Sequence, residues 1–193
     1  MPGDVVAHVV EHVFDATLLD PAIRIAAGFA QDEVVKLVGP QRMENLTRLA
    51  KRVREKLSGK PAETPPLSVS VPLLEAARDE SRDGLLDLWA DLLAAAADPT
   101  RAGSYRAAFL EIVRGMDPID TKLITMPNPP KHFPNNEINE KAAMLGITRD
   151  QFEVSIENLI KLGVLFKPNS SVVAYSALGR EFCRVILSDG ATA

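Results

Sequence analysis

The sequence predicts a mainly α-helical protein, with an N-terminal and central helical bundle followed by a C-terminal winged helix-turn-helix domain that contains a small β-hairpin. Three observations support this fold class. Apolar residues recur at three- and four-residue intervals along most of the chain, which is the period of an amphipathic helix. Proline, glycine and capping residues divide these stretches into short helices. Two β-prone runs occur only near the C-terminus, after two helices joined by a tight turn.

The N-terminal part is predicted to contain three helices. Residues 5–19 and 21–38 are strongly apolar stretches separated by a proline, which is favoured at the first position of a helix. After a Gly-Pro breaker, residues 42–57 carry one apolar face and one basic face. Residues 58–66 read SGKPAETPP, and these turn formers cannot continue a helix, so they are expected to form a linker.

The central part is predicted to contain four more helices. A short helix over 72–78 is expected to open with its proline, and Ser81 is expected to cap a longer helix that stops at Asp98-Pro99. Two shorter helices are expected over 105–115 and 119–125, the second after an Asp-Pro pair. Trp89 and Phe109 sit among apolar neighbours at helical spacing and are expected in the core.

The C-terminal part is predicted to form the winged helix-turn-helix. After an irregular stretch, MPNPPKHFPNN, the expected elements are a helix capped by Asn136, a helix that starts at Thr148, strands at 164–166 and 172–175, and a final helix. Thr148 and Gln151 are spaced as a capping box, in which each side chain accepts a hydrogen bond from the other residue's backbone. The polar residues 167–171 between the two strands predict a hairpin turn.

These elements predict N-terminal helices over 1–57, a linker over 58–66, a central helical domain over 67–127 and a winged-helix domain over 128–193. The chain is 46% hydrophobic and 25% charged, a composition typical of globular proteins rather than disordered ones. No secretory signal or membrane span is visible. The chain has a single cysteine, Cys183, so it cannot form an internal disulfide, and a cytoplasmic location is therefore expected. The Cys183 thiol is expected to be buried.

One motif matches a metal site. His8, Glu11 and His12 spell H-x-x-E-H, the spacing that inverted zinc peptidases use on a helix. Such enzymes need a third protein ligand, and no second histidine cluster follows. An amphipathic helix with polar residues at its edge is therefore the favoured interpretation, and no metal, cofactor, catalytic residue or small-molecule substrate is predicted. The other histidine, His132, lies in the proline-rich stretch and is expected to be exposed.

An acidic stripe recurs every four residues, and its members are Asp79, Asp83, Asp87 and Asp91, with Glu80 beside them. Like charges at this spacing repel each other on a helix. A solvated face is the favoured interpretation, a docking surface for a basic partner is the main alternative, and a metal site is disfavoured because a straight helix offers ligands on one side only.

The helix over 42–57 is the only locally basic segment. Its cations are Arg42, Arg48, Lys51, Arg52, Arg54 and Lys56. They could contact phosphate, an anionic lipid surface or the acidic stripe itself, which is their natural internal partner. A solvated face is again favoured. Peripheral membrane contact by the N-terminal helices stays an alternative to their burial in a bundle or a homo-oligomer.

A winged helix invites a DNA-binding interpretation, but the charges oppose it. The net charge is −4, and the predicted recognition helix exposes Asp150, Glu153 and Glu157 with only Arg149 and Lys161 at its ends. Phosphate contacts supply much of the affinity of DNA readers, so this helix would repel a duplex. A protein partner is therefore favoured, and a winged-helix transcription regulator is kept as the alternative function.

Three segments carry a resemblance to a known family. They read RMENLTRLAKRVREKL, PPLSVSVPLLEAARDESRDGLLDLWADLLAAAADP and YRAAFLEIVRGMDPIDTKLI, and the C-terminal YSALGREF extends the match to 35–187. The chain thereby resembles the abortive-infection alpha family of bacterial phage-defence proteins. The resemblance implies a defence role in which an infected cell stops supporting the phage, and it implies no established catalytic residues. The expected function is a non-enzymatic helical interaction protein with a protein partner or a second copy.

Overall fold

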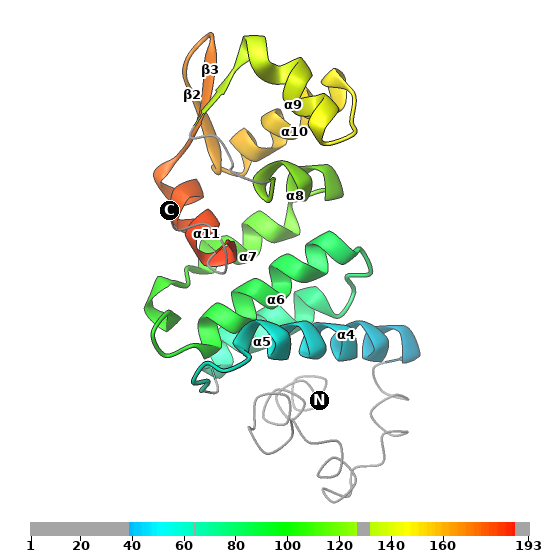
Figure 1. Ribbon diagram of the computed structural model, residues 1–193. Coiled ribbons are helices and arrows are strands. Elements are labelled where there is room, and N and C mark those ends of the chain that lie inside the picture. The colour runs from blue at the N-terminus through cyan, green and yellow to red at the C-terminus, as the bar shows by residue number, and fades with distance from the viewer. Residues whose placement is uncertain (1–38, 64, 127–131, 188–193) are drawn as a thin grey trace, which may run out of the picture. The chain divides into compact units, whose positions relative to one another are not determined.

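The computed structural model describes residues 39–63, 65–126 and 132–187, and it is mainly helical with one small antiparallel sheet (Figure 1). The described α-helices are α4 (Pro40–Leu57), α5 (Leu67–Ala77), α6 (Asp83–Ala97), α7 (Ala107–Arg114), α8 (Pro118–Ile124), α9 (Ile138–Met144), α10 (Arg149–Lys161) and α11 (Ala177–Ile186). The strands are β1 (His132–Pro134), β2 (Leu165–Asn169) and β3 (Val172–Tyr175). The predicted helices over 5–19 and 21–38 lie outside the described residues.

The chain forms two compact units, one up to Ala107 and one from Ala108 onward. The predicted division into N-terminal, central and winged-helix domains stays a prediction. In the first unit, α4 and α5 both pack against α6. Helix α6 is buried around most of its circumference, and Trp89 at its middle is 2% exposed, as the sequence predicts for a core residue.

Helix α5 begins five residues earlier than predicted, so Pro72 lies inside it instead of opening it. A proline within a helix lacks the N–H that the backbone ladder needs, which is why the sequence favours a start at this residue. The helix nevertheless extends back to Leu67 because it buries one continuous face, formed by Ser70, Leu73, Leu74 and Ala77. Burial of that face overrides the local preference.

Helix α6 has a different N-terminal cap from the predicted one. Arg82 occupies the N-cap position, and Ser81 lies one residue outside the helix. The carboxylate of Glu80 accepts hydrogen bonds from the Arg82 backbone N–H (2.9 Å) and from its guanidinium (2.8 Å). A carboxylate at this position complements the positive end of the helix dipole. Glu80 therefore stabilises the N-terminus of α6, the role that was predicted for Ser81.

In the second unit the sheet has the order β1-β3-β2, and both neighbouring pairs are antiparallel. The hairpin of β2 and β3 confirms the prediction, although β2 continues to Asn169 with an irregularity after Phe166. Pro168 is tolerated because β2 is an edge strand. Strand β1 was not predicted from the sequence. Its residues lie in the stretch MPNPPKHFPNN, which was expected to be irregular.

Strand β1 belongs to the sheet through its pairing with β3, where Phe133 lies opposite Val173. The Phe133 ring is 1% exposed and lies 6.0 Å from the rings of both Phe152 and Tyr175. This aromatic cluster joins the sheet to α10. His132 contributes its backbone to the strand.

The helices of this unit are close to those predicted. Phe109 on α7 is fully buried, as expected. The predicted capping box starts α10, with Thr148 accepting from the Gln151 N–H (3.2 Å) and Gln151 accepting from the Thr148 N–H (2.9 Å). Asn136 is not a helix cap, because it lies within the 3₁₀ turn Asn135–Glu137 and α9 begins after that turn.

Candidate interaction surfaces

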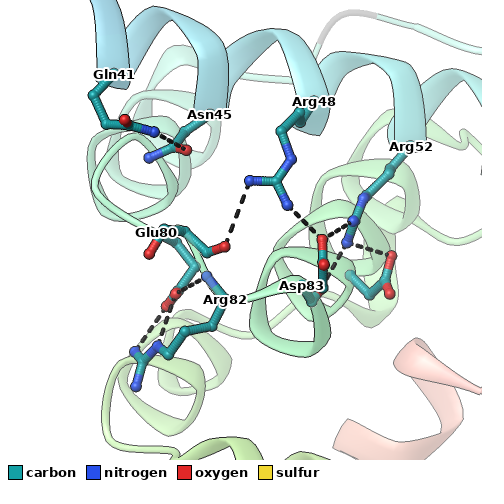
Figure 2. Close-up of polar contacts among 9 residues, drawn as sticks. Gln41, Asn45, Arg48, Arg52, Glu80, Arg82 and Asp83 are labelled. Atoms are coloured by element: carbon teal, nitrogen blue, oxygen red, sulfur yellow. Dashed lines mark hydrogen bonds and ion pairs between the residues drawn. The ribbon is translucent and has the colours of Figure 1, made fainter.

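Helix α4 is joined to α6 and to the turn before it by a ladder of ion pairs, which we call the α4–α6 ladder. Figure 2 shows the part of it in which Arg48 and Arg52 meet Asp83. Its pairs are Arg42 to Asp79 (2.6 Å), Arg48 to Asp83, Arg52 to Asp83 (2.5 Å) and Asp87 (2.9 Å), and Lys56 to Asp91 (2.6 Å). The partners advance together along the sequence, so α4 and α6 run parallel. Asp83, Asp87 and Asp91 on α6 recur every four residues, as do Arg48, Arg52 and Lys56 on α4, so each set lies on one face of its helix. Arg42 and Asp79 extend the ladder before the start of α6.

The ladder differs in burial between its two ends. Asp83 is largely exposed, and hydrogen bonds from Arg52 and Arg48 hold the pKa of its carboxyl below its usual range. At the other end, the side chains of Lys56 and Asp91 are only 24% and 15% exposed. Exposed ion pairs are screened by water and contribute little, so the half-buried pair is the one expected to matter for stability.

A buried amide fixes the beginning of α4 against the turn between α5 and α6. Asn45 is 2% exposed, and its side-chain nitrogen donates to the carbonyl of Arg78 at 2.9 Å. Its oxygen accepts a longer bond from Gln41 (3.4 Å). An amide that is buried with its donor satisfied specifies one position of the two segments, because any slip would leave it unpaired.

These contacts decide between the interpretations of the acidic stripe and the basic helix. Both were expected to be solvated faces, whereas their charges meet in the α4–α6 ladder. Four of the six cations of the basic helix therefore pair with aspartates of the acidic stripe, and these are Arg42, Arg48, Arg52 and Lys56. The alternative in which the acidic stripe is the internal partner of the basic helix is the one that the geometry supports.

The half-buried pair gives a first test. We expect Lys56→Glu to lower the free energy of unfolding by about 1–2 kcal/mol, since it places two carboxylates together at a partly desolvated site. Exchanging the charges in Lys56→Glu/Asp91→Lys should recover much of that loss. The matched control is Lys51→Glu on the same helix. Lys51 pairs with Glu55 at 3.9 Å, and both side chains are exposed, so its loss should cost little. Urea unfolding checks all three, and equal losses for both single variants would contradict the assignment.

Low pH is expected to destabilise the first unit, which contains the α4–α6 ladder. Burial alone would raise the pKa of Glu80, but the bonds and the charge of Arg82 together outweigh it and leave that pKa lowered. A side-chain hydrogen bond from Thr100 lowers the pKa of Asp98. Carboxyls with lowered pKa in the folded state add stability above their unfolded pKa and lose it as pH falls through the folded value. Together with Asp83, they should make the first unit lose stability as the pH falls below about 4.

The second candidate surface is the outer face of α10, whose inner face is anchored by a buried carboxylate. Asp120 on α8 is 1% exposed. Its oxygens accept hydrogen bonds from the Ser155 hydroxyl, from the Asn158 amide (2.6 Å) and from the backbone N–H of Asp117 (2.7 Å). Asn158 also donates to the carbonyl of Gly115 (2.9 Å). This network fixes the rotation of α10 about its axis, and hence which residues it presents outward.

The outward face of α10 combines one apolar side chain with acids, and the exposed Lys161 follows one turn beyond Glu157. Val154 is 64% exposed, and Asp150 and Glu157, one turn away on either side, are also exposed. Arg149 donates to Glu153 (2.8 Å) and to Asn139 (3.3 Å), so its charge is already engaged within the unit. We call Asp150, Val154 and Glu157 the outer face of α10. Positions three and four apart on a helix are neighbours, so these side chains form one patch.

Exposed apolar side chains are concentrated in the second unit. Within the part of the chain that the structure describes, the exposed large hydrophobic residues are Met144 on α9, Val154 on α10 and Phe166 on β2. Single exposed apolar residues are common on protein surfaces. All three lie in the segment from α9 to β2, so this segment exposes more large apolar side chains than the other described segments.

Two predicted sites remain, the histidine motif and Cys183. His8, Glu11 and His12 lie outside the described residues. Cys183 is half-buried, and burial raises the pKa of its thiol to about 12, which opposes formation of a nucleophilic thiolate. The neighbouring Tyr175 hydroxyl also has its pKa raised by burial, and no hydrogen bond of ordinary geometry satisfies it.

Over 39–63, 65–126 and 132–187, no group of three or more His, Cys, Asp or Glu side chains is arranged to hold a metal ion. Among the helices of these same segments, none combines the length and the apolar character that crossing a membrane requires.

The molecule is thus a mainly helical protein whose charged helices pair internally and whose small sheet packs on α10. A family model described as abortive infection alpha matches residues 41–177. This is most of the chain, so the chain belongs to the abortive infection alpha family, which confirms the resemblance seen in the sequence. A search of curated proteins and a search of solved structures each found no match to this chain.

Proposed function

We propose that the chain is a non-enzymatic, cytoplasmic interaction protein that acts in abortive-infection defence against phage. Its membership of the abortive infection alpha family carries the defence part of the proposal. The interaction part is supported by the outer face of α10, where an exposed valine lies between two carboxylates. The raised pKa of the Cys183 thiol is consistent with a chain that does not use this residue for covalent catalysis.

We further propose that the segment from α8 to α11 is a winged helix-turn-helix. In support, the elements follow the order α8, β1, α9, α10, β2, β3, and the first strand pairs with the last in the sheet order β1-β3-β2. The turn between α9 and α10 is short and contains Gly146 with a φ of 66°, a conformation that favours glycine. In this arrangement α10 is the second helix of the motif, and the β2–β3 hairpin is the wing.

The alternative function, a transcription regulator that binds DNA, is less well supported by the charges. A DNA-reading helix presents Arg, Lys, Asn or Gln to base edges. The outer face of α10 presents two carboxylates and a valine instead, and Arg149 is engaged by Glu153. A salt titration of duplex binding discriminates the two functions. Tight binding with a steep dependence on salt would favour the regulator, because it reports neutralised phosphates.

The defence role is tested by phage plating. We expect cells that express the protein to support fewer plaques of at least one phage in a broad panel, and to die or stop growing when infected at high multiplicity. The Val154→Asp variant tests whether protection depends on the outer face of α10, because its substitution lies at an exposed position and should leave the fold intact. Loss of protection in this variant would link defence to the outer face of α10, whereas unchanged plating by the parent protein across the panel would count against the role.

A further inference from the structure

We propose that residues 21–38 of this chain pack against α4 and cover a strip of apolar side chains along it. The strip occupies one side of the helix, because its successive members are three, four and seven residues apart. They are Met43, Leu46, Ala50 and Leu57, all half-buried, and we call them the α4 strip. Next to the strip lies the buried side of α4, which carries Leu49 and Val53. Packing among the described residues therefore covers one side of α4 and leaves the α4 strip partly open.

The α4 strip is long enough to receive a helix. It extends from Met43 to Leu57, about 21 Å along the helix axis. Helix α5, which packs against α4, also leaves apolar residues half-buried, and these are Val69, Pro72 and Ala76. Single apolar residues scattered over a surface are normal, whereas a row of this length is typical of a surface that another element covers.

The charges beside the α4 strip are compatible with an acidic occupant. Arg54 is exposed one turn after Ala50, and Arg42 at the other edge is paired with Asp79. The other exposed charges of α4 lie farther round the helix, at Glu44, Lys51 and Glu55. Residues 1–38 contain six Asp and Glu against one arginine and one lysine, so they can supply carboxylates to Arg54. An anionic lipid surface would also attract this arginine, so charge alone does not select the occupant.

Connection and composition select residues 21–38. The sequence predicts one helix over these residues, and eleven of the 18 are hydrophobic, so the helix needs a neighbour to cover it. Gly39 has a φ of 88°, a conformation that favours glycine, and Pro40 follows it, so the chain turns just before α4. Helices joined by so short a turn pack antiparallel. A segment tethered this closely has an effective concentration in the millimolar range, above that of a second copy or a separate protein.

Cysteine cross-linking in the full-length chain tests this arrangement. In a Cys183→Ala background, Ala50→Cys on the α4 strip is combined with a second cysteine before the turn. The positions for that second cysteine are Ala26, Ala27 and Ala30. They lie 9–13 residues before Gly39 and Ala50 lies 11 residues after it, so an antiparallel pair brings them together.

The matched control replaces Ala50→Cys by Lys51→Cys, at the next residue, which is exposed on another side of α4. A disulfide requires Cα atoms roughly 4.4–6.8 Å apart, so at least one Ala50 pair should link within the monomer about tenfold faster than its Lys51 counterpart. Equal rates at the two positions would overturn the proposal. Disulfides that form only between chains would overturn it as well, because they would assign the α4 strip to a second copy.

Trypsin cleavage gives a second readout without engineered cysteines. Arg24 and Lys36 are cleavage sites within 21–38. Ala50→Glu, which places a charge on the α4 strip, should speed cleavage there about tenfold, whereas Lys51→Glu should leave it unchanged. Circular dichroism checks that both variants stay helical. Equal cleavage of the parent and Ala50→Glu would contradict the proposal, and so would flotation of the parent with phosphatidylserine vesicles that Ala50→Glu abolishes. None of these readouts involves phage, so they stand whatever the plating assay gives.

Discussion

Replacing Gly179 with alanine is expected to lower the free energy of unfolding by about 3 kcal/mol, the upper end of the range for overpacking a core. Gly179 lies in the first turn of α11 and is buried. A Cβ at this position would lie 2.0 Å from the carbonyl oxygen of Val164 and 2.8 Å from its carbonyl carbon. Both are backbone atoms, and the same oxygen accepts the Ser176 N–H at 3.0 Å, so it cannot move without breaking that bond.

Two other glycines provide a graded comparison for this prediction. A Cβ at Gly115 would lie 2.5 Å from a methyl carbon of Leu162, which is the end of a flexible side chain and can move, so Gly115→Ala should cost only about 1 kcal/mol. A Cβ at Gly103 would meet no heavy atom within 4 Å, and its substitution should change stability by less than about 0.5 kcal/mol. Urea unfolding midpoints should follow this order. A Gly179 variant as stable as the Gly103 variant would refute the close approach.

Elements whose signals are local were predicted well from the sequence. Helix α10 has both a capping box and a regular apolar period, and the predicted cap residue, Thr148, agrees with the structure. The cap of α11 is local as well, because Ser176 accepts from the N–H of Gly179 three residues later at 2.9 Å. Such signals depend on residues within one turn, so no knowledge of the fold is needed to read them.

The elements that were mispredicted depend on distant residues. Strand β1 contains only three residues, and its ladder is made by β3 about forty residues further along the chain. Helix α5 was predicted to start at Pro72, because the stabilising contacts of its first turn come from tertiary burial of residues such as Ser70. Neither contribution leaves a periodic signal in the segment itself.

The α4–α6 ladder is an intermediate case. The sequence shows acids every four residues on one helix and cations on another, which is the signal that makes them candidate partners. It does not show that the two helices run parallel and in register, because that arrangement depends on α5 returning the chain between them. The outer face of α10 was missed as an apolar site for a related reason. Val154 is one apolar residue among several on this helix, and only packing shows which of them is exposed.

Removal of the buried carboxylate is the second substitution for which a large loss is expected. Asp120→Ala should lower the free energy of unfolding by about 3 kcal/mol, because it leaves three donors, on Ser155, Asn158 and the Asp117 backbone, without their acceptor in a buried site. The reach of Asp120 back to the N–H of Asp117 also caps α8, so the first turn of that helix should fray.

A double-mutant cycle separates this network from a simple loss of packing. Ser155→Ala alone should cost about 1 kcal/mol, since the carboxylate keeps its other donors. In the Asp120→Ala background the same substitution should cost less, because the hydroxyl there is already unpaired. Glu157→Ala, an exposed acid on α10, should change stability by less than about 0.5 kcal/mol and serves as the control. Strict additivity of Asp120→Ala and Ser155→Ala would mean that the two side chains do not stabilise the unit through one shared bond.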